Sequence, residues 1–269
     1  MKLSISNIAW DEKDDEEMLK FIKSSGYGAI EIAPTRIIRI NPYSHIEEAK
    51  KFADNLQTKY NIKISSMQSI WFGKEQKIFG TQNERNELIK YTKEAIDFAE
   101  AVGCSNLVFG CPRNRVIDSN NIDKNVIIDF LKEIGYYAIS KSIYFSVEPN
   151  PIIYNTNFIN TTSEAIELIK MINNNGIKLN VDLGTIIYNN EDINFINENV
   201  NLINHVHVSE PYLEIIKPRK IHKDLIKALI KNKYNGYISI EMKNQDNIQQ
   251  VKDTMIYLEN IYKEISDDG

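Results

Sequence analysis

The segment KLNVDLG, residues 178–184, contains a short apolar run that ends on the carboxylate of Asp182. Two similar runs follow it, INHVHV at 203–208 and YISIE at 237–241, and each also ends close to a polar side chain. Short apolar runs bounded by polar segments predict buried β-strands. Because longer amphipathic segments lie between the runs, this part of the chain predicts strands and helices in alternation.

The same alternation continues to both ends of the chain. The strand-like runs start roughly 25 to 45 residues apart, a spacing that suits a repeated strand–helix unit. There are eight runs, at residues 3–9, 29–33, 62–68, 106–109, 143–147, 178–182, 203–208 and 237–241.

The segments between the runs carry helical periodicity. Apolar residues recur at three- and four-residue steps within 88–102, 126–137 and 248–262. The polar segment 160–164 supplies a helix N-cap. Glycines fall where a helix must hand over to the next strand, and they predict left-handed C-terminal caps at Gly26, Gly103, Gly176 and Gly236.

Eight strand–helix units predict an α/β protein with a parallel sheet covered by helices. The chain has 269 residues, which is the size of a single (β/α)₈ TIM barrel. We therefore expect one domain over residues 1–269. A doubly wound open sheet is the alternative, but the glycine-rich phosphate turn G-x-G-x-x-G that it favours is missing from the sequence.

The composition is that of a globular protein, with 42% hydrophobic and 26% charged residues. The formal net charge of −5 argues against a nucleic-acid partner. The two cysteines, Cys104 and Cys111, form no C-x-x-C pair, and the chain shows neither a signal-peptide core nor a long apolar span. These features favour a cytoplasmic protein that contacts no membrane; a homo-oligomer stays open.

Four consecutive predicted strands end in a carboxylate or an imidazole, at Glu148, Asp182, His207 and Glu241. The carboxyl ends of barrel strands meet at one face, so these side chains should converge. Three carboxylates that close would repel one another unless a cation lay among them. Oxygen ligands with one imidazole suit Mn²⁺, Co²⁺ or Mg²⁺, with Zn²⁺ less favoured. His205 shares the inward face but lies one layer deeper, where we expect a core or supporting histidine.

Further side chains near the strand ends could line a substrate pocket, although each also has a structural interpretation. Aromatic rings could stack on a sugar, or they could close the end of the barrel. The two arginines after the fourth strand could bind a phosphate or carboxylate, or they could be solvated. The candidates are Trp10, Glu31, Gln68, Trp71, Arg113, Arg115 and Asn150.

The sequence resembles the xylose isomerase-like TIM-barrel superfamily, and within it the sugar phosphate isomerase/epimerase group. The resemblance runs the full length, and its motifs include SVEPN at 146–150, VDLG at 181–184, HVHVSE at 205–210 and SIE at 239–241. It implies that Glu148, Asp182, His207 and Glu241 bind one divalent metal. It also implies that Glu148 and Glu241 are an acid/base pair acting on a carbohydrate.

Three positions depart from the ketose 3-epimerases of that group. A substrate-contacting histidine is replaced by Thr185, a glutamate by Tyr154, and an arginine by Leu213. The metal residues match while the residues around the substrate do not, so the resemblance leaves the substrate open.

The expected reaction is removal of a proton next to a sugar carbonyl and its return from another residue, which epimerises or isomerises the substrate. One alternative is a metal-dependent dehydratase or other lyase acting on a cyclic polyol. A second is an endonuclease IV-like DNA-repair nuclease, which needs more than the four histidines present. A third is a non-catalytic sugar-binding barrel.

Overall fold

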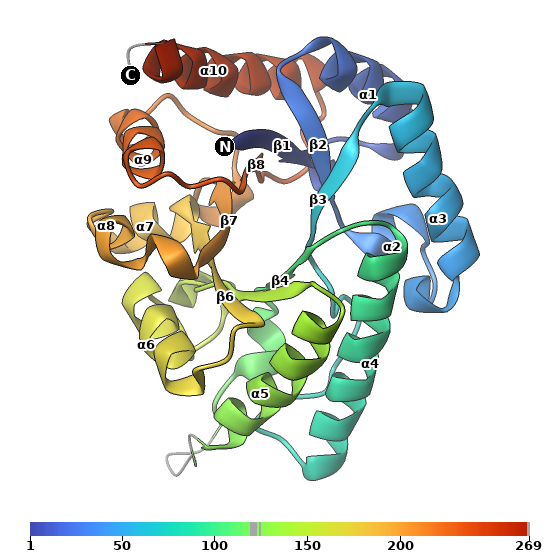
Figure 1. Ribbon diagram of the computed structural model, residues 1–269, viewed down its shortest axis with the longest axis vertical. Helices are drawn as coiled ribbons and strands as arrows, with labels where there is room; N and C mark the ends of the chain where they lie inside the picture. Colours follow the sequence, from blue (N-terminus) through green and yellow to red (C-terminus); the bar gives the residue numbers. More distant parts are fainter. Residues whose placement is uncertain (119–122, 124, 268–269) are drawn as a thin grey trace.

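The computed structural model describes residues 1–118, 123 and 125–267. Eight parallel strands close into a barrel in the order β1 to β8, each strand pairing with the next and β8 pairing with β1 (Figure 1). The predicted (β/α)₈ architecture is confirmed. The strands are β1 Lys2–Ser6, β2 Tyr27–Ile32, β3 Lys63–Met67, β4 Asn106–Phe109, β5 Tyr144–Val147, β6 Ile177–Asp182, β7 Ile203–Val208 and β8 Tyr237–Ile240.

Helices form a ring around this barrel, as Figure 1 shows, with α10 next to α9 near the two chain ends. They are α1 Asp15–Ser24, α2 Pro34–Ile37, α3 Ile46–Asn55, α4 Gln82–Ala101, α5 Asn125–Ser140, α6 Thr162–Ile172, α7 Leu183–Asn189, α8 Phe195–Asn199, α9 Lys220–Lys231 and α10 Ile248–Asp267. None of the helices in the described residues is both long and apolar enough to cross a membrane.

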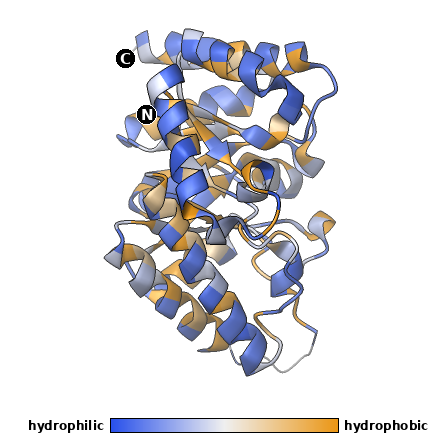
Figure 2. Cartoon of the chain, turned by 90° about the vertical axis from the view of Figure 1, so that its right-hand side faces the viewer, coloured by the Kyte–Doolittle hydropathy of each residue, from blue (hydrophilic) through white to orange (hydrophobic). Residues whose placement is uncertain are grey.

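The two faces of the strands differ in chemistry. Residues that point toward the helices are aliphatic or aromatic and fully buried, as at Phe145, Val147, Val206 and Val208. Residues two apart share a face, and the residues of the alternate face include Ser146, Asn180 and His205, which are also buried. Apolar residues are frequent along the strands, and polar and apolar residues alternate along the helices (Figure 2). The apolar core therefore lies between strands and helices, while the barrel interior is largely polar.

The first strand is shorter than the predicted run 3–9. It ends at Ser6, whose hydroxyl accepts a hydrogen bond from the backbone N–H of Ile8 and begins a 3₁₀ turn, η1, over Asn7–Ala9. The other seven strands lie within two residues of their predicted bounds. The predicted N-cap is also present, because Thr161 and Glu164 form a capping box at the start of α6.

The glycine prediction is right at one position and wrong at three. Gly103 has a φ of +69°, as a left-handed cap requires, but Gly26, Gly176 and Gly236 do not have positive φ. At Gly176 the requirement is space, since a Cβ would lie 2.1 Å from the carbonyl oxygen of Gly135. Asparagines take the left-handed position after several helices instead, as Asn173 does after α6.

Candidate metal centre

The four residues predicted to converge do so at the carboxyl end of the barrel. Glu148 follows β5, Asp182 ends β6, His207 lies near the end of β7, and Glu241 follows β8. All four are buried, and one ligand atom from each lies within 4.8 Å of those of the other three. Parallel pairing places Asp182 beside His207 and so brings neighbouring strand ends to one point.

His207 is at the centre of this group. Its Nδ1 lies 2.8 Å from Oε1 of Glu148 and 3.2 Å from Oε2 of Glu241. The side-chain amide of Asn180, two residues before Asp182 on the inward face of β6, donates to Oε1 of Glu148 at 2.7 Å. The same amide nitrogen lies 3.2 Å from Nδ1 of His207. The imidazole and two carboxylates thus share one small polar volume.

Asp182 is oriented by the start of α7, where it is also the N-cap. Its Oδ2 accepts a hydrogen bond of 2.7 Å from the backbone N–H of Thr185, and the Thr185 hydroxyl lies 2.7 Å from the same oxygen. The hydroxyl of Ser209 donates to Oδ1. Thr185 therefore supports the aspartate at the position where the ketose 3-epimerases carry a histidine.

Three ionisable side chains of this group have shifted pKa values. Burial, and then the charges of Glu148 and Glu31, raise the pKa of Glu241 to about 7 against the lowering effect of His207. Burial and Glu148 likewise raise the pKa of Asp182. Burial would lower the pKa of His207, but Glu241, Glu31 and Glu148 raise it well above its usual value. Carboxylates that resist ionisation together would gain from a cation among them, so the donor set fits a divalent ion.

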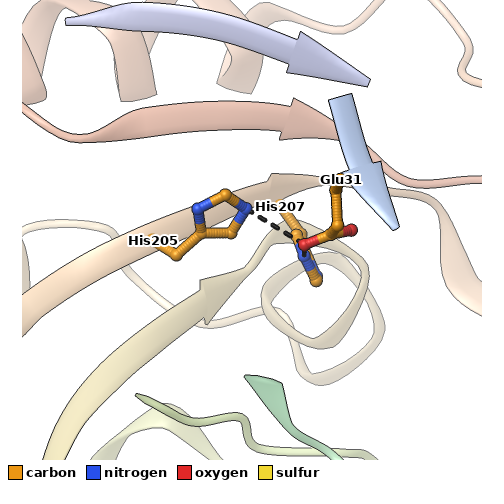
Figure 3. A group of neighbouring side chains, drawn as sticks. All are labelled: Glu31, His205 and His207. Carbon is orange, nitrogen blue, oxygen red and sulfur yellow. Dashed lines mark hydrogen bonds and ion pairs between the residues drawn. The ribbon is translucent and has the colours of Figure 1, made fainter. Parts of the chain in front are cut away.

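A second group of buried side chains, Glu31, His205 and His207, shares the imidazole of His207 with the first (Figure 3). Glu31, on β2, is 0% exposed, and its Oε2 lies 2.9 Å from Nε2 of His207 and 3.2 Å from Nε2 of His205. Burial alone would raise the pKa of Glu31, but His207 and His205 hold that pKa below its usual value. As predicted, both histidines point into the barrel, and His205 lies outside the four-residue group.

Among the other candidates, Asn150 is closest to the group, because its amide donates to Oε2 of Glu148 at 3.0 Å. Arg115 is 0% exposed and donates to the backbone oxygen of Glu148 and to Oδ1 of Asn150, both at 2.8 Å. Arg113 lies in the same 3₁₀ turn, η5 (Pro112–Arg115), and is exposed. Gln68 is buried and donates to Oε1 of Glu31 at 3.1 Å.

Both tryptophans are buried in the apolar core. The indole N–H of Trp10 donates to Asp15 at 2.8 Å, and that of Trp71 donates to Thr92 at 2.9 Å. The Trp71 ring also packs against Phe109 and Phe130. Its neighbour Phe72, by contrast, is 70% exposed. Substrate contact by these aromatic residues, or by any other candidate, stays a prediction.

The sequence alone does not identify Asn180 as part of the site, and it shows Tyr154 only as a departure from the ketose 3-epimerases. Asn180 could have been found, since it lies two residues before Asp182 and must share its face. Tyr154, in the 3₁₀ turn η6 (Ile152–Tyr154) after β5, has a pKa raised by burial and by the charges of Asp182, Glu241 and Glu148. Its ring centroid lies 6.5 Å from that of Tyr212, in the turn η8 (Pro211–Leu213) after β7.

Solved structures with this fold include several sugar epimerases. The 3-keto-D-glucoside 4-epimerase YcjR from E. coli has a TM-score of 0.77 at 19% identity, covering 97% of this chain and 99% of its own. The D-psicose 3-epimerase from Clostridium cellulolyticum H10 has a TM-score of 0.77 at 15% identity, covering 98% and 99%. The IolI protein, solved with a bound zinc atom, has a TM-score of 0.70 at 18% identity, covering 100% and 97%.

A search of curated protein sequences gave no match. The profile of one family, described as xylose isomerase-like TIM barrel, matches residues 19–261. These residues include strands β2 to β8 and all four members of the candidate metal centre. The chain therefore belongs to the xylose isomerase-like TIM barrel family.

Proposed function

We propose that this protein is a metal-dependent epimerase or isomerase that moves a proton on a sugar, a sugar phosphate or a related polyol. One observation carries the proposal: Glu148, Asp182, His207 and Glu241 bring their ligand atoms within 4.8 Å of one another at the end of the barrel where TIM-barrel enzymes act. That several of the similar structures are sugar epimerases by name, including the two described above, supports a carbohydrate substrate.

The four residues would hold one divalent ion. Three oxygen ligands and one nitrogen favour Mn²⁺, followed by Co²⁺ or Mg²⁺, and the zinc of the IolI structure keeps Zn²⁺ among the candidates. When bound, such an ion supplies Lewis-acid stabilisation of negative charge on the substrate's oxygens.

The acid/base work falls to Glu148 and Glu241. They follow β5 and β8, and each has one oxygen near Nδ1 of His207, so they approach the centre from different sides. A bound ion would favour the ionised form of both carboxylates, in which each can accept a proton from the substrate. Asn150 donates to the second oxygen of Glu148 and would orient it.

Tyr154 is the substrate-binding residue we would add. The charges of Asp182, Glu241 and Glu148 and its partial burial keep its hydroxyl protonated. It can therefore donate a hydrogen bond to a substrate oxygen. A glutamate at this position, as in the ketose 3-epimerases, would accept one instead, so we expect a different substrate preference.

The decisive experiment is a substrate screen in deuterium oxide. Ketoses, their phosphates, nucleotide sugars and cyclic polyols would be incubated with the metal-loaded protein, and solvent deuterium would be sought in substrate and product. Incorporation with inversion or carbonyl transfer supports the proposal. Loss of water from a cyclic polyol, with no epimer or isomer formed from any sugar, would establish a dehydratase instead. We place the reaction in the cytoplasm, since both cysteines are free thiols.

A further inference from the structure

A buried carboxylate lies behind the candidate metal centre, on the far side of the His207 ring. Nδ1 of this imidazole faces Glu148 and Glu241, whereas Nε2 points away from them and lies 2.9 Å from Oε2 of Glu31 (Figure 3). Glu31 comes from β2 and reaches across the barrel to β7, and neither side chain is exposed. The two nitrogens of one ring thus meet two different environments.

Without a cation both ring nitrogens face carboxylates, because Nδ1 lies 2.8 Å from Glu148 and 3.2 Å from Glu241. A carboxylate can only accept, so Nε2 beside Glu31 must carry the proton. On the other side, the Asn180 amide nitrogen is a donor, and it lies 3.2 Å from Nδ1. A donor facing Nδ1 favours a bare nitrogen there. When an ion lies among the carboxylates, Nδ1 must be bare to bind it, and Glu31 then accepts a hydrogen bond from the proton that stays on Nε2.

We propose that Glu31 is a positioning residue that fixes the tautomer and ring orientation of His207, so that Nδ1 is the nitrogen offered to the metal. The proposal rests on the metal centre proposed above and assigns Glu31 a role other than direct substrate contact. Carboxylate partners behind a ligating histidine orient the ring and raise its basicity, and their loss typically weakens metal binding 10- to 100-fold.

Glu31 is itself held by a donor on its other oxygen. The Gln68 amide donates to Oε1 of Glu31 at 3.1 Å and to the Ser6 hydroxyl at 2.6 Å. Oε2 is left for the two imidazoles, with Nε2 of His205 at 3.2 Å and the rings nearly perpendicular. A glutamine at position 31 would replace one of these two acceptor oxygens with an N–H₂ group. That group would face the N–H donor of either Gln68 or His207, and the hydrogen bond there would be lost.

The alternative is that Glu31, His205 and His207 bind a second ion, because their ligand atoms also lie within 4.8 Å of one another. His207 would then have to bridge two ions through its two nitrogens. We favour the positioning role because both oxygens of Glu31 already meet donors at hydrogen-bond distance, from His207 and Gln68. Nε2 of His205 makes no hydrogen bond within the described residues and is the atom that a second ion would engage. Counting bound ions separates the two possibilities.

The test measures metal affinity rather than activity. Dissociation constants for Mn²⁺ and Zn²⁺ would be determined by chelator competition for the wild-type protein, Glu31→Gln and the double variant Glu31→Gln/Gln68→Glu. We expect Glu31→Gln to bind 10- to 100-fold more weakly. The exchange of the two side chains restores an acceptor opposite every donor, so the double variant should recover most of the affinity.

Glu210→Gln is the matched control. Glu210 is also a buried carboxylate just after β7, but it pairs with Arg219 at 2.7 Å and contacts no member of the metal centre. Its variant should keep wild-type metal affinity. Affinity within twofold of wild type in Glu31→Gln would overturn the proposal, as would a double variant that binds no better than Glu31→Gln.

A measurement on the wild-type protein needs no variant to fold. In ¹⁵N NMR spectra of the Zn²⁺-loaded protein, we expect His207 to carry its proton on Nε2. A proton on Nδ1, or two ions bound per chain, would overturn the proposal while leaving the metal centre in place. A wild-type protein that binds none of the four ions would overturn the proposed function itself, so the two failures are distinguishable.

Discussion

The guanidinium of Arg115 donates a 2.8 Å hydrogen bond to the backbone oxygen of Glu148, 33 residues further along the chain. A second bond, to Oδ1 of Asn150, spans the same gap between the loops after β4 and β5. The cationic side chain is fully buried and holds the backbone from which the first glutamate of the metal centre projects.

Replacing the two neighbouring arginines should therefore have different effects. Arg115→Ala removes two charged hydrogen bonds from buried acceptors and should lower the free energy of unfolding by about 2–4 kcal/mol. Arg113→Ala should change the free energy of unfolding little, because that side chain is exposed. Urea denaturation would measure both. Equal losses in the two variants would contradict the assignment.

The Arg113→Ala variant also tests whether this arginine binds an anionic group of the substrate. If Arg113 clamps a phosphate, Arg113→Ala should weaken binding of a phosphorylated substrate by roughly 1.5–3 kcal/mol. Binding of the unphosphorylated analogue should be little affected. An equal effect on both ligands would assign Arg113 a structural role.

Purified protein should contain about one divalent ion per chain if the proposed ligand set acts as one site. Chelator treatment should remove the ion, and His207→Ala should prevent its return. Plasma emission spectroscopy before and after dialysis would count it. His45→Ala is the control, since that histidine lies on the surface with its side chain 51% exposed. Retention of a full metal complement by His207→Ala would rule out the ligand set.

Glu148→Gln and Glu241→Gln should each lower turnover by at least the roughly 10²- to 10⁴-fold that general-base catalysis contributes. Glutamine keeps the shape and one oxygen but cannot accept a proton, so some metal should be retained. If each glutamate serves one face of the reacting carbon, each variant should still exchange the proton of one epimer with solvent deuterium. An active wild-type enzyme that incorporates no deuterium would instead indicate a hydride shift.

Tyr154→Phe should lower kcat/KM up to about 10-fold, the effect of losing one neutral hydrogen bond. The metal content should not change, because the hydroxyl is not one of the proposed ligands. Steady-state kinetics combined with metal analysis would test both parts. Unchanged kinetics for every accepted substrate would remove Tyr154 from the binding site.

His222 on α9 should make the protein less stable in acid. Burial lowers its pKa to about 4 from an ordinary 6.5, and its Nδ1 lies 3.0 Å from the Tyr257 hydroxyl. Between these values the unfolded chain binds a proton that the native protein does not, so stability present above pH 6.5 is lost as the pH falls toward 4. This loss should be about 2–3 kcal/mol by pH 4.5.

The comparison is between His222→Gln and the wild-type protein, with urea denaturation at pH 7.5 and pH 4.5. The variant should lose less unfolding free energy over this range, and a surface variant, His45→Gln, should behave as wild type. An identical pH dependence in His222→Gln and wild type would show that the buried imidazole is not the cause.

The barrel and the convergence of its four strand ends could be predicted from the sequence because both follow from periodicity. Apolar runs at regular spacing give the strands, and in a parallel barrel the side chains at strand ends must meet. The same alternation rule places His205 and Asn180 on the inward face. The sequence shows Glu31 near a strand end, but it does not reveal that His205 and His207 are its partners, because they lie 174 and 176 residues away.

Whether a loop side chain is buried or exposed could not be predicted in this way. Nothing local distinguishes Arg115, which is buried and bonded to the loop after β5, from Arg113 two residues earlier, which is exposed. The same holds for the buried Trp71 beside the exposed Phe72. Whether such a side chain turns inward depends on the space and hydrogen-bond acceptors that distant segments provide.

The division of each strand into an apolar outer face and a polar inner face has a consequence for how this protein can change over generations. Alternate residues of one strand serve different ends, since Val206 and Val208 pack under the helices while His205 and His207 face the interior. Substitutions at inward positions can reshape the pocket without removing apolar contacts from the core. Because these inward side chains are buried and bonded to one another, a lineage could explore new substrates by exchanging hydrogen-bond partners together, and directed evolution should vary inward positions in pairs.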